Sequence, residues 1–340
     1  MKDDRLRLGL LGTGKVTEYA VLDQVRQGAD VVVTAVASRD LARAQDFAQR
    51  YTIDRAFGSY EQMLAEADID AVYNALPNSL HREWTLAALK RGFPVLCEKP
   101  FASNAVEATE MARAAEEANL LLIEAKHWQD HPIVGQIRTA LRPLGRLRRI
   151  DAVYSLQGDY LPRDNHRFNP ALSGGWTMDQ GCYCVDFARF VTGAEPLAVL
   201  SATATLEAPG LDGGMEAELL FPGDVRARIG GSMIDVSVKG LDVWARVEGD
   251  NGVLHLTNPY MPGENPFTIE QGAVLRLELA DGSVTETRGD LVSSWRCQLD
   301  SFARRVREPV PVPHPAWDSV HNMKVIDDIY SAAGLRPRGF

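Results

Sequence analysis

A short apolar segment near the start of the chain runs straight into a glycine turn, and this junction limits the folds open to the sequence. Leu8-Gly9-Leu10-Leu11 is followed by Gly12-Thr13-Gly14 and then by a helix-like pattern. A buried strand that turns abruptly into a helix is how a βαβ unit begins. Further uniformly apolar runs, separated by helical patterns, occur at 31–37, 71–75, 95–97 and 120–123. Such strands are covered on both faces, which predicts a doubly wound parallel sheet.

The second half of the chain has a different pattern. Segments of alternating apolar and polar residues, about six between residues 147 and 279, are separated by turn signals such as Asp250-Asn251-Gly252. We therefore expect an α/β chain: a Rossmann dinucleotide-binding domain over residues 1–125, and a C-terminal α+β domain over 126–340 with a large, mostly antiparallel open sheet. The open face of that sheet is expected to be apolar enough to form a homodimer or homotetramer.

Bulk composition excludes several classes of protein. The chain has 340 residues and a formal net charge of -10, so a nucleic-acid partner is not expected. The sequence shows neither a secretory signal at Met1 nor an apolar run of the roughly 20 residues that a membrane helix needs. Its four cysteines contain no Cys-x-x-Cys pair, so we expect no metal, and Cys182 and Cys184 are read as core packing. A cytoplasmic protein is the resulting expectation.

The glycine turn itself predicts a dinucleotide site. The first glycine permits the tight turn, and the second allows a pyrophosphate to approach the backbone at the start of the helix. Thr17 stands where a third glycine is usual, so helix and strand are expected to pack slightly further apart. The cofactor-binding residues expected here are Gly12, Thr13, Gly14, Lys15 and Val16.

The end of the second strand bears on cofactor choice. An NAD site usually places Asp or Glu there to bind the ribose 2′-hydroxyl, whereas this chain has Ser38-Arg39, with Arg43 four residues on. Serine can donate to a 2′-phosphate, and arginine can pair with it and stack on adenine. The pattern favours NADP over NAD. The alternative is that Asp40 caps the next helix while the arginines are merely solvated.

Two further strand ends point to the same edge of the sheet. Leu76-Pro77-Asn78 follows the run 71–75 and is expected beside the cofactor; His81 either contacts the cofactor or helps to start a helix. Glu98-Lys99-Pro100 follows the run 95–97. A lysine there can polarise a substrate carbonyl or stabilise a forming alkoxide, although a surface Glu–Lys pair would give the same letters.

A second constellation lies between Gly174 and Asp186. Helical spacing predicts Asp179, Tyr183 and Asp186 on one face. A carboxylate, a phenol and a lysine can together orient a hydroxyl and move its proton, and a nearby Lys99 is expected to lower the pKa of Tyr183. Asp186 has the alternative of an ordinary helix-face charge. Together these features suggest hydride-transfer chemistry.

With these motifs the chain resembles the glucose–fructose oxidoreductase, inositol dehydrogenase and rhizopine-catabolism family (Gfo/Idh/MocA). The resemblance covers nearly the whole length. It rests on the strand–glycine turn, Pro77-Asn78 to His81, Glu98-Lys99-Pro100, Gly174-Gly175 to Asp186, and Asn322 to Asp327. Residues 35–48 and the tyrosine look closest to the NADP-dependent dihydrodiol and aldose dehydrogenase branch.

The resemblance implies an NADP-dependent oxidoreductase acting on a sugar, polyol or cyclic diol. It implies Lys99 as the catalytic lysine, Asp179 as a substrate-orienting carboxylate, and Tyr183 in an acid/base position where many relatives carry histidine. Arg163, His166 and Arg167 either line the substrate pocket or belong to a solvated loop. Two alternatives from other classes are a regulatory or sensor protein that binds the dinucleotide without turnover, and an NAD-assisted glycoside hydrolase.

Overall fold

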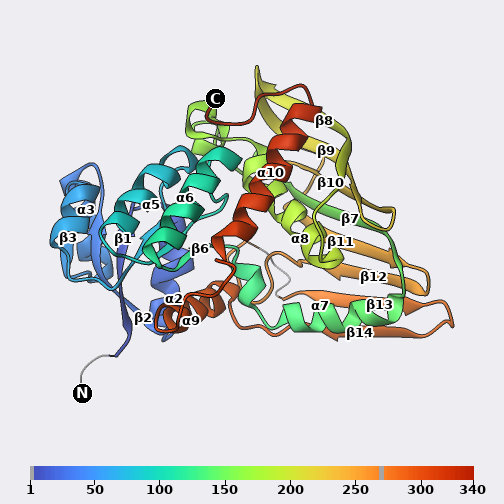
Figure 1. Cartoon of the computed structure of the whole chain (residues 1–340), viewed down its shortest axis with the longest axis horizontal. Helices are drawn as coiled ribbons and strands as arrows, with labels where there is room; N and C mark the ends of the chain where they lie inside the picture. The colour runs from blue at the N-terminus through green and yellow to red at the C-terminus, as the bar shows by residue number, and fades with distance from the viewer. Residues whose placement is uncertain (1–3, 268–271) are drawn as a thin grey trace. The chain divides into compact units, whose positions relative to one another are not determined.

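The computed structural model describes residues 4–267 and 272–340; Met1 lies outside them. The chain divides into two compact units, which Figure 1 colours along the sequence. The first holds the described residues up to His127 together with Trp295–Val320, and the second holds Trp128–Ser294 with His321–Phe340. The first break lies two residues beyond the boundary proposed from sequence. Because residues 295–320 return to the first unit, one boundary does not describe the chain.

The first unit is built on a parallel sheet, as expected. Among the described residues it has six strands in the order β3-β2-β1-β4-β5-β6, and every pair is parallel. Its strands are β1 (Leu6–Leu11), β2 (Val31–Ala37), β3 (Arg55–Phe57), β4 (Ala71–Asn74), β5 (Val95–Cys97) and β6 (Leu122–Glu124). The order reverses between β1 and β4, and in a doubly wound sheet ligands bind at the carboxyl end of the strands beside such a reversal.

Helices of the first unit connect these strands (Figure 1). They are α1 (Lys15–Thr17), η1 (Glu18–Leu22), α2 (Asp23–Arg26), α3 (Leu41–Tyr51), α4 (Tyr60–Glu66), η2 (Asn78–Leu80), α5 (His81–Lys90), α6 (Ala105–Ala118) and α9 (Ser294–Val306). Leu299, Phe302 and Ala303 of α9 are buried in the same apolar core as Leu8 and Val31. This burial explains why a segment so late in the sequence belongs to the first unit.

The second unit contains the large sheet. It has eight strands among the described residues, in the order β14-β13-β12-β11-β7-β10-β9-β8, and only β7 with β10 is parallel. The strands are β7 (Leu147–Leu156), β8 (Ala198–Ala208), β9 (Leu211–Phe221), β10 (Val225–Ser232), β11 (Leu241–Gly249), β12 (Gly252–Thr257), β13 (Val274–Leu279) and β14 (Val284–Arg288). The expected six strands thus become eight, because β12 and β14 were not recognised.

Helices also accompany the second sheet. They are η3 (His127–Asp130), α7 (Ile133–Leu141), η4 (Arg142–Leu144), η5 (His166–Phe168), η6 (Pro170–Leu172), η7 (Thr177–Gly181) and α8 (Cys182–Thr192), while α10 (Ala316–Ala332) runs from the first unit into the second. Helix α8 packs against β7 and β10. No helix in residues 4–267 and 272–340 has the length and apolar character needed to cross a membrane.

The prediction that the open face of this sheet is apolar is wrong. The residues that alternate with buried ones along the strands are mainly arginines and carboxylates. They pair within and across strands: Arg149 with Asp151 at 2.9 Å, Arg228 with Glu216 at 2.8 Å, Arg246 with Glu248 at 2.8 Å, and Arg276 with Glu278 at 2.9 Å. We call this pattern the charged ladder. These charged residues alternate with buried ones at a period of two, which is the pattern that predicted half-buried strands from the sequence.

Candidate functional site

The glycine turn has the geometry that a pyrophosphate site requires. Gly12 follows β1 with φ +100°, and its N–H donates to the Ala37 carbonyl at 3.0 Å. A side chain there would lie 3.2 Å from Leu76 and would be strained. Gly14 caps helix α1, and no described atom lies within 4 Å of where its Cβ would stand. The residues present therefore fit a dinucleotide, because the second glycine leaves its backbone open to approach.

Thr17 replaces the usual third glycine by bonding to the turn. It is fully buried, and both its N–H, at 3.0 Å, and its hydroxyl donate to the Gly14 carbonyl. The next residues, Glu18–Leu22, form a π-helix. Such wide turns are rare and are common at functional sites. The helix expected after the turn is present, with this irregular second turn.

At the end of β2 the structure confirms the helix cap that was considered from sequence. Asp40 caps α3 by accepting from the N–H groups of Ala42 at 2.9 Å and Arg43 at 3.3 Å. Arg43 is nevertheless held in place, because its Nε donates to Thr13 Oγ1 at 2.8 Å. Ser38 is buried and Arg39 is exposed. Burial raises the pKa of the Tyr60 hydroxyl, and the charges of Arg39 and Arg43 oppose that rise, which places both arginines near this phenol.

A groove of about 360 Å³ lies beside this end of the strand. Its lining comes from the glycine turn, from η1 and from α3, and consists of Thr13, Glu18, Asp40, Ala42, Arg43, Asp46, Phe47 and Arg50. Sequence reasoning missed Arg50, one helical turn beyond Asp46. The same i, i+3 and i+4 spacing that singled out Arg43 could have found it.

His81 is the first residue of α5, so it stands where that helix starts, which is one of the two alternatives considered from sequence. The imidazole is fully buried, with Nδ1 2.9 Å from the Pro100 carbonyl and Nε2 2.7 Å from the Leu76 carbonyl. Burial lowers the pKa of His81, and the two carbonyls oppose that effect. The side chain thus connects the loop after β4, which carries Pro77 and the buried Asn78, to the turn after β5. It is a bridge between two loops of the candidate site.

Glu98 and Lys99 are not a surface pair. Glu98 is buried, accepts a hydrogen bond from the Tyr73 hydroxyl, and accepts from the Lys99 N–H at 3.2 Å. The Glu98 N–H donates to the Asn74 carbonyl at 2.9 Å, which continues the β4–β5 pairing to the point where Lys99 begins. The half-buried Lys99 side chain therefore stands on a backbone fixed by a buried carboxylate.

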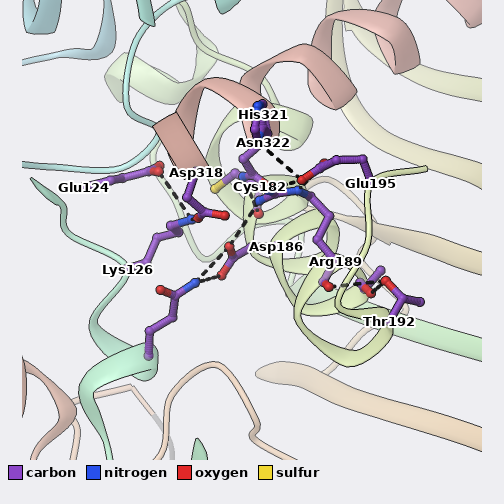
Figure 2. Close-up of polar contacts among 12 residues, drawn as sticks. Glu124, Lys126, Cys182, Asp186, Arg189, Thr192, Glu195, Asp318, His321 and Asn322 are labelled. Carbon is purple, nitrogen blue, oxygen red and sulfur yellow. Dashed lines mark hydrogen bonds and ion pairs between the residues drawn. The ribbon is translucent and has the colours of Figure 1, made fainter. Parts of the chain in front are cut away.

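A second lysine at this edge was missed. Lys126 follows β6 and is buried, with its Nζ 2.8 Å from Asp318 and 3.7 Å from Glu124 (Figure 2). The Ala125 N–H donates to the Cys97 carbonyl at 2.7 Å, so β6 and β5 end side by side. Polar residues directly after an apolar run were the available signal in Glu124-Ala125-Lys126, as they were for Glu98-Lys99.

In the second unit the structure brings together two residues predicted separately. Arg167 Nε lies 2.5 Å from Asp179 Oδ2, and Gln180 Nε2 donates to the same oxygen at 2.7 Å. Asp179 belongs to the π-helical turn η7, which leads directly into α8. A carboxylate held by a guanidinium in this way is fixed in orientation, which a substrate-orienting group requires.

Tyr183 is the second predicted residue of this helix. It is buried, with its ring centroid 5.9 Å from that of Tyr154 and 6.1 Å from that of Tyr260. The phenol is therefore set in an aromatic cluster rather than in solvent. Lys99 belongs to the first unit, and Asp179 and Tyr183 belong to the second.

Asp186 is not a solvated charge on the helix face. It is buried, accepts from Trp128 Nε1 at 3.0 Å and from Gln129 Nε2 at 2.8 Å, and lies 3.9 Å from Arg189. Arg189 in turn pairs with Glu195 at 2.7 Å (Figure 2). These contacts tie α8 to the segment before α7.

The loop before the glycine pair is ordered by its own side chains. Arg163 pairs with Glu207 at 2.9 Å and stacks over Phe168 at 4.7 Å. His166 begins the short helix η5, which also contains Arg167. Of the three loop residues proposed from sequence, Arg167 contacts Asp179. Among the described residues no group of three or more His, Cys, Asp and Glu could hold a metal.

Two family models match this chain. One, described as an oxidoreductase family with an NAD-binding Rossmann fold, matches residues 6–126. The other, a Gfo/Idh/MocA C-terminal domain, matches residues 139–255. One model lies in each of the two units, and the pair matches the resemblance drawn from the motifs.

Individual proteins give the same picture. The chain is 34% identical to a D-xylose 1-dehydrogenase (NADP(+)) from Haloferax volcanii, over 96% of this chain and 97% of that one. It is 32% identical to human trans-1,2-dihydrobenzene-1,2-diol dehydrogenase, over 75% of each chain. A solved 3-ketoreductase from Actinomadura kijaniata, in complex with NADP and TDP-benzene, superposes with a TM-score of 0.84 over 98% of each chain; at 24% identity it shows the shared fold.

Changing each of the two glycines of the turn to alanine should affect a different property: stability at Gly12 and dinucleotide affinity at Gly14. Gly12→Ala forces a side chain into positive φ against Leu76, so we expect the free energy of unfolding to fall by about 1–3 kcal/mol. Gly14→Ala meets no described atom and keeps an ordinary φ of -76°. Its stability should stay within about 0.5 kcal/mol of the wild type, whereas its dinucleotide affinity should fall at least about tenfold, since the methyl group stands where the pyrophosphate approaches.

Denaturant unfolding measures the first effect, and fluorescence titration with the dinucleotide measures the second. Wild-type dinucleotide affinity in Gly14→Ala would remove the turn from the cofactor site.

Proposed function

The chain belongs to the Gfo/Idh/MocA oxidoreductase family, and we propose that it is an NADP-dependent dehydrogenase or reductase for a sugar, polyol or cyclic diol. The reacting carbon carries a hydroxyl in one direction and a carbonyl in the other. The observation that supports this reading most is Lys99, which a buried carboxylate holds at the carboxyl edge of a dinucleotide-binding sheet. The names of the xylose and dihydrodiol dehydrogenases support the substrate class.

Each proposed role follows from the chemistry of one side chain. The bound nicotinamide supplies or accepts the hydride. Lys99 polarises the substrate oxygen and stabilises negative charge that develops on it. Tyr183 takes the hydroxyl proton during oxidation and returns it during reduction. Asp179, held by Arg167, orients a substrate hydroxyl, and Arg163 and His166 are proposed to contribute to the same substrate-binding loop.

The preference for NADP rests on the end of β2. The NADP-binding group is proposed to be Ser38, Arg39 and Arg43, of which Arg43 is already oriented by Thr13. No Asp or Glu occupies the position directly after the strand, and Asp40 is engaged as a helix cap. A guanidinium and a serine hydroxyl suit a 2′-phosphate better than the 2′-hydroxyl of NAD.

We further propose a homodimer or homotetramer that forms through the charged ladder, and a cytoplasmic location. A two-fold interface needs a surface that is complementary to itself, and alternating arginines and carboxylates provide one. All four cysteines are free thiols, which suits a reducing compartment.

The deciding experiment follows the absorbance of the reduced nicotinamide with a panel of aldoses, polyols and cyclic diols, with NADP and NAD in parallel. Turnover with one class, faster with NADP, is the expected outcome. Sugar release without any net change in absorbance would indicate the glycoside hydrolase chemistry instead. Dinucleotide binding without turnover on any member of the panel would indicate a regulatory protein.

Arg39→Asp should reverse the cofactor preference. A charged hydrogen bond to the 2′-phosphate contributes about 1.5–3 kcal/mol, so the ratio of NADP to NAD affinity should fall about ten- to a hundredfold or more. Titration of both dinucleotides measures this ratio. The exposed Arg91, which follows α5, provides the matched control in Arg91→Asp. An unchanged ratio in Arg39→Asp would exclude Arg39 from this role.

Lys99→Met and Tyr183→Phe should both lower turnover but differ in pH dependence. Loss of either group is expected to cost about 10²–10⁴-fold, because each acts on the reacting oxygen. The wild-type rate of alcohol oxidation should rise with pH as the proton acceptor ionises, and Tyr183→Phe should abolish this rise. Tyr260→Phe, in the same aromatic cluster, is the control for packing. A Tyr183→Phe enzyme with the wild-type rate and pH profile would assign the proton to another group.

A further inference from the structure

The helix that carries Asp179 and Tyr183 is capped by a residue from a different element. Its first turns begin after Gly175, and the Thr177 N–H donates at 2.7 Å to Oδ2 of Asp212, the second residue of β9. Helices leave their first N–H groups without partners inside the helix, and a carboxylate is the favoured acceptor there. Asp212 is fully buried, so this cap is shielded from water.

Asp212 is itself held by two residues from the end of the described chain. The Tyr330 hydroxyl of α10 donates to its Oδ1 at 2.9 Å, and Arg338, beyond α10, pairs with the same oxygen. Arg338 also donates to the Gly210 carbonyl and stacks over the Tyr330 ring at 4.6 Å. Its side chain is only 6% exposed. A buried arginine with a carboxylate, a carbonyl and a ring as partners is a built contact rather than a surface pair.

The packing around the Asp212–Arg338 pair is tight. Gly175 has φ +128°, and a Cβ there would stand 2.2 Å from Asp212 Oδ1 and 2.8 Å from the Arg338 guanidinium. The chain therefore passes as close to the Asp212–Arg338 pair as a backbone can. Any movement of that pair changes the space into which the start of the helix fits.

Asp179 lies two residues after the capped N–H. Its own N–H donates to the Gly175 carbonyl at 3.1 Å, so it is in the turn whose start Asp212 fixes. This turn, Thr177–Gly181, is π-helical, a conformation that needs support from its surroundings because it is rarely stable by itself. The cap and the π-turn therefore act on the same carboxylate that Arg167 orients.

We propose that Arg338 is a positioning residue: through Asp212 it sets the orientation of Asp179, so that the segment after α10 controls turnover at the substrate site. This inference rests on the proposed function. A displacement of about 1 Å in a reacting group can cost about a hundredfold in rate, so a contact this far from the chemistry is enough to matter. The dinucleotide site lies on other elements, and its affinity should be unaffected.

Arg338→Ala tests the proposal, with Arg336→Ala, an exposed arginine two residues away, as the control. We expect kcat to fall about ten- to a hundredfold, while the dissociation constant of the dinucleotide changes by less than about twofold, within the usual additivity error. Arg338→Lys, which retains the charge but lacks the planar guanidinium that reaches both Asp212 and the Gly210 carbonyl, should recover part of the rate. Hydrogen exchange at the amides of residues 177–181 should be faster in Arg338→Ala and unchanged in the control.

Tyr330→Phe keeps the test decisive if Arg338→Ala does not fold. It removes one hydroxyl donor to Asp212 and should lower kcat about two- to tenfold. Wild-type kcat in whichever of these variants folds overturns the proposal, as does a fall in kcat matched by an equal loss of dinucleotide affinity. If the wild type turns over no substrate, the proposed function fails, and the exchange measurement alone then decides this inference: unchanged exchange overturns it.

Discussion

The carboxyl edge of the parallel sheet is the constraint on which the first unit depends. Parallel pairing makes every strand end at this edge, so each residue that follows a strand is delivered to the same neighbourhood. Gly12 follows β1, Ser38 follows β2, and Lys99 follows β5. The strands can be uniformly apolar because helices cover both faces, and polar chemistry is therefore confined to the ends. The His81 bridge between the Leu76 and Pro100 carbonyls then fixes two of these ends to each other.

Much of this unit was predictable from sequence, because burial on both faces imposes an unbroken apolar run that a reader can find. Polar residues directly after such runs identified Ser38 and Glu98-Lys99. Lys126 has the same signal, because it follows the apolar run that forms β6. The return of α9 to the first unit could not be read locally, since the burial of Phe302 against Leu8 depends on contacts almost three hundred residues apart.

The second unit was less predictable for a physical reason. Strand β14, Val284–Arg288, is exposed along its length, so pairing with β13 rather than an apolar pattern defines it. The π-helical turn at Thr177–Gly181 departs from the regular helical spacing that the sequence analysis assumed, and Asp179 and Asp186 bind different partners. Buried polar contacts hold this helix at several points. Asp212 caps its start. Figure 2 shows two more: the Asn322 amide donates to the Cys182 carbonyl at 3.1 Å, and Asp186 forms its contacts near the middle of the helix.

The charged ladder also bears on nonspecific association at this face of the sheet. An exposed apolar sheet face is an aggregation liability, and a face covered with charged side chains avoids it. Here opposite charges are neighbours along β7, as in Arg149 and Asp151, and between β9 and β10, as in Glu216 and Arg228. Salt screens the attraction between such charges over about 8 Å at physiological ionic strength, whereas it does not screen the packing of side chains. Salt is therefore expected to weaken the charge pairing of this surface before it weakens the fold, whose core is apolar.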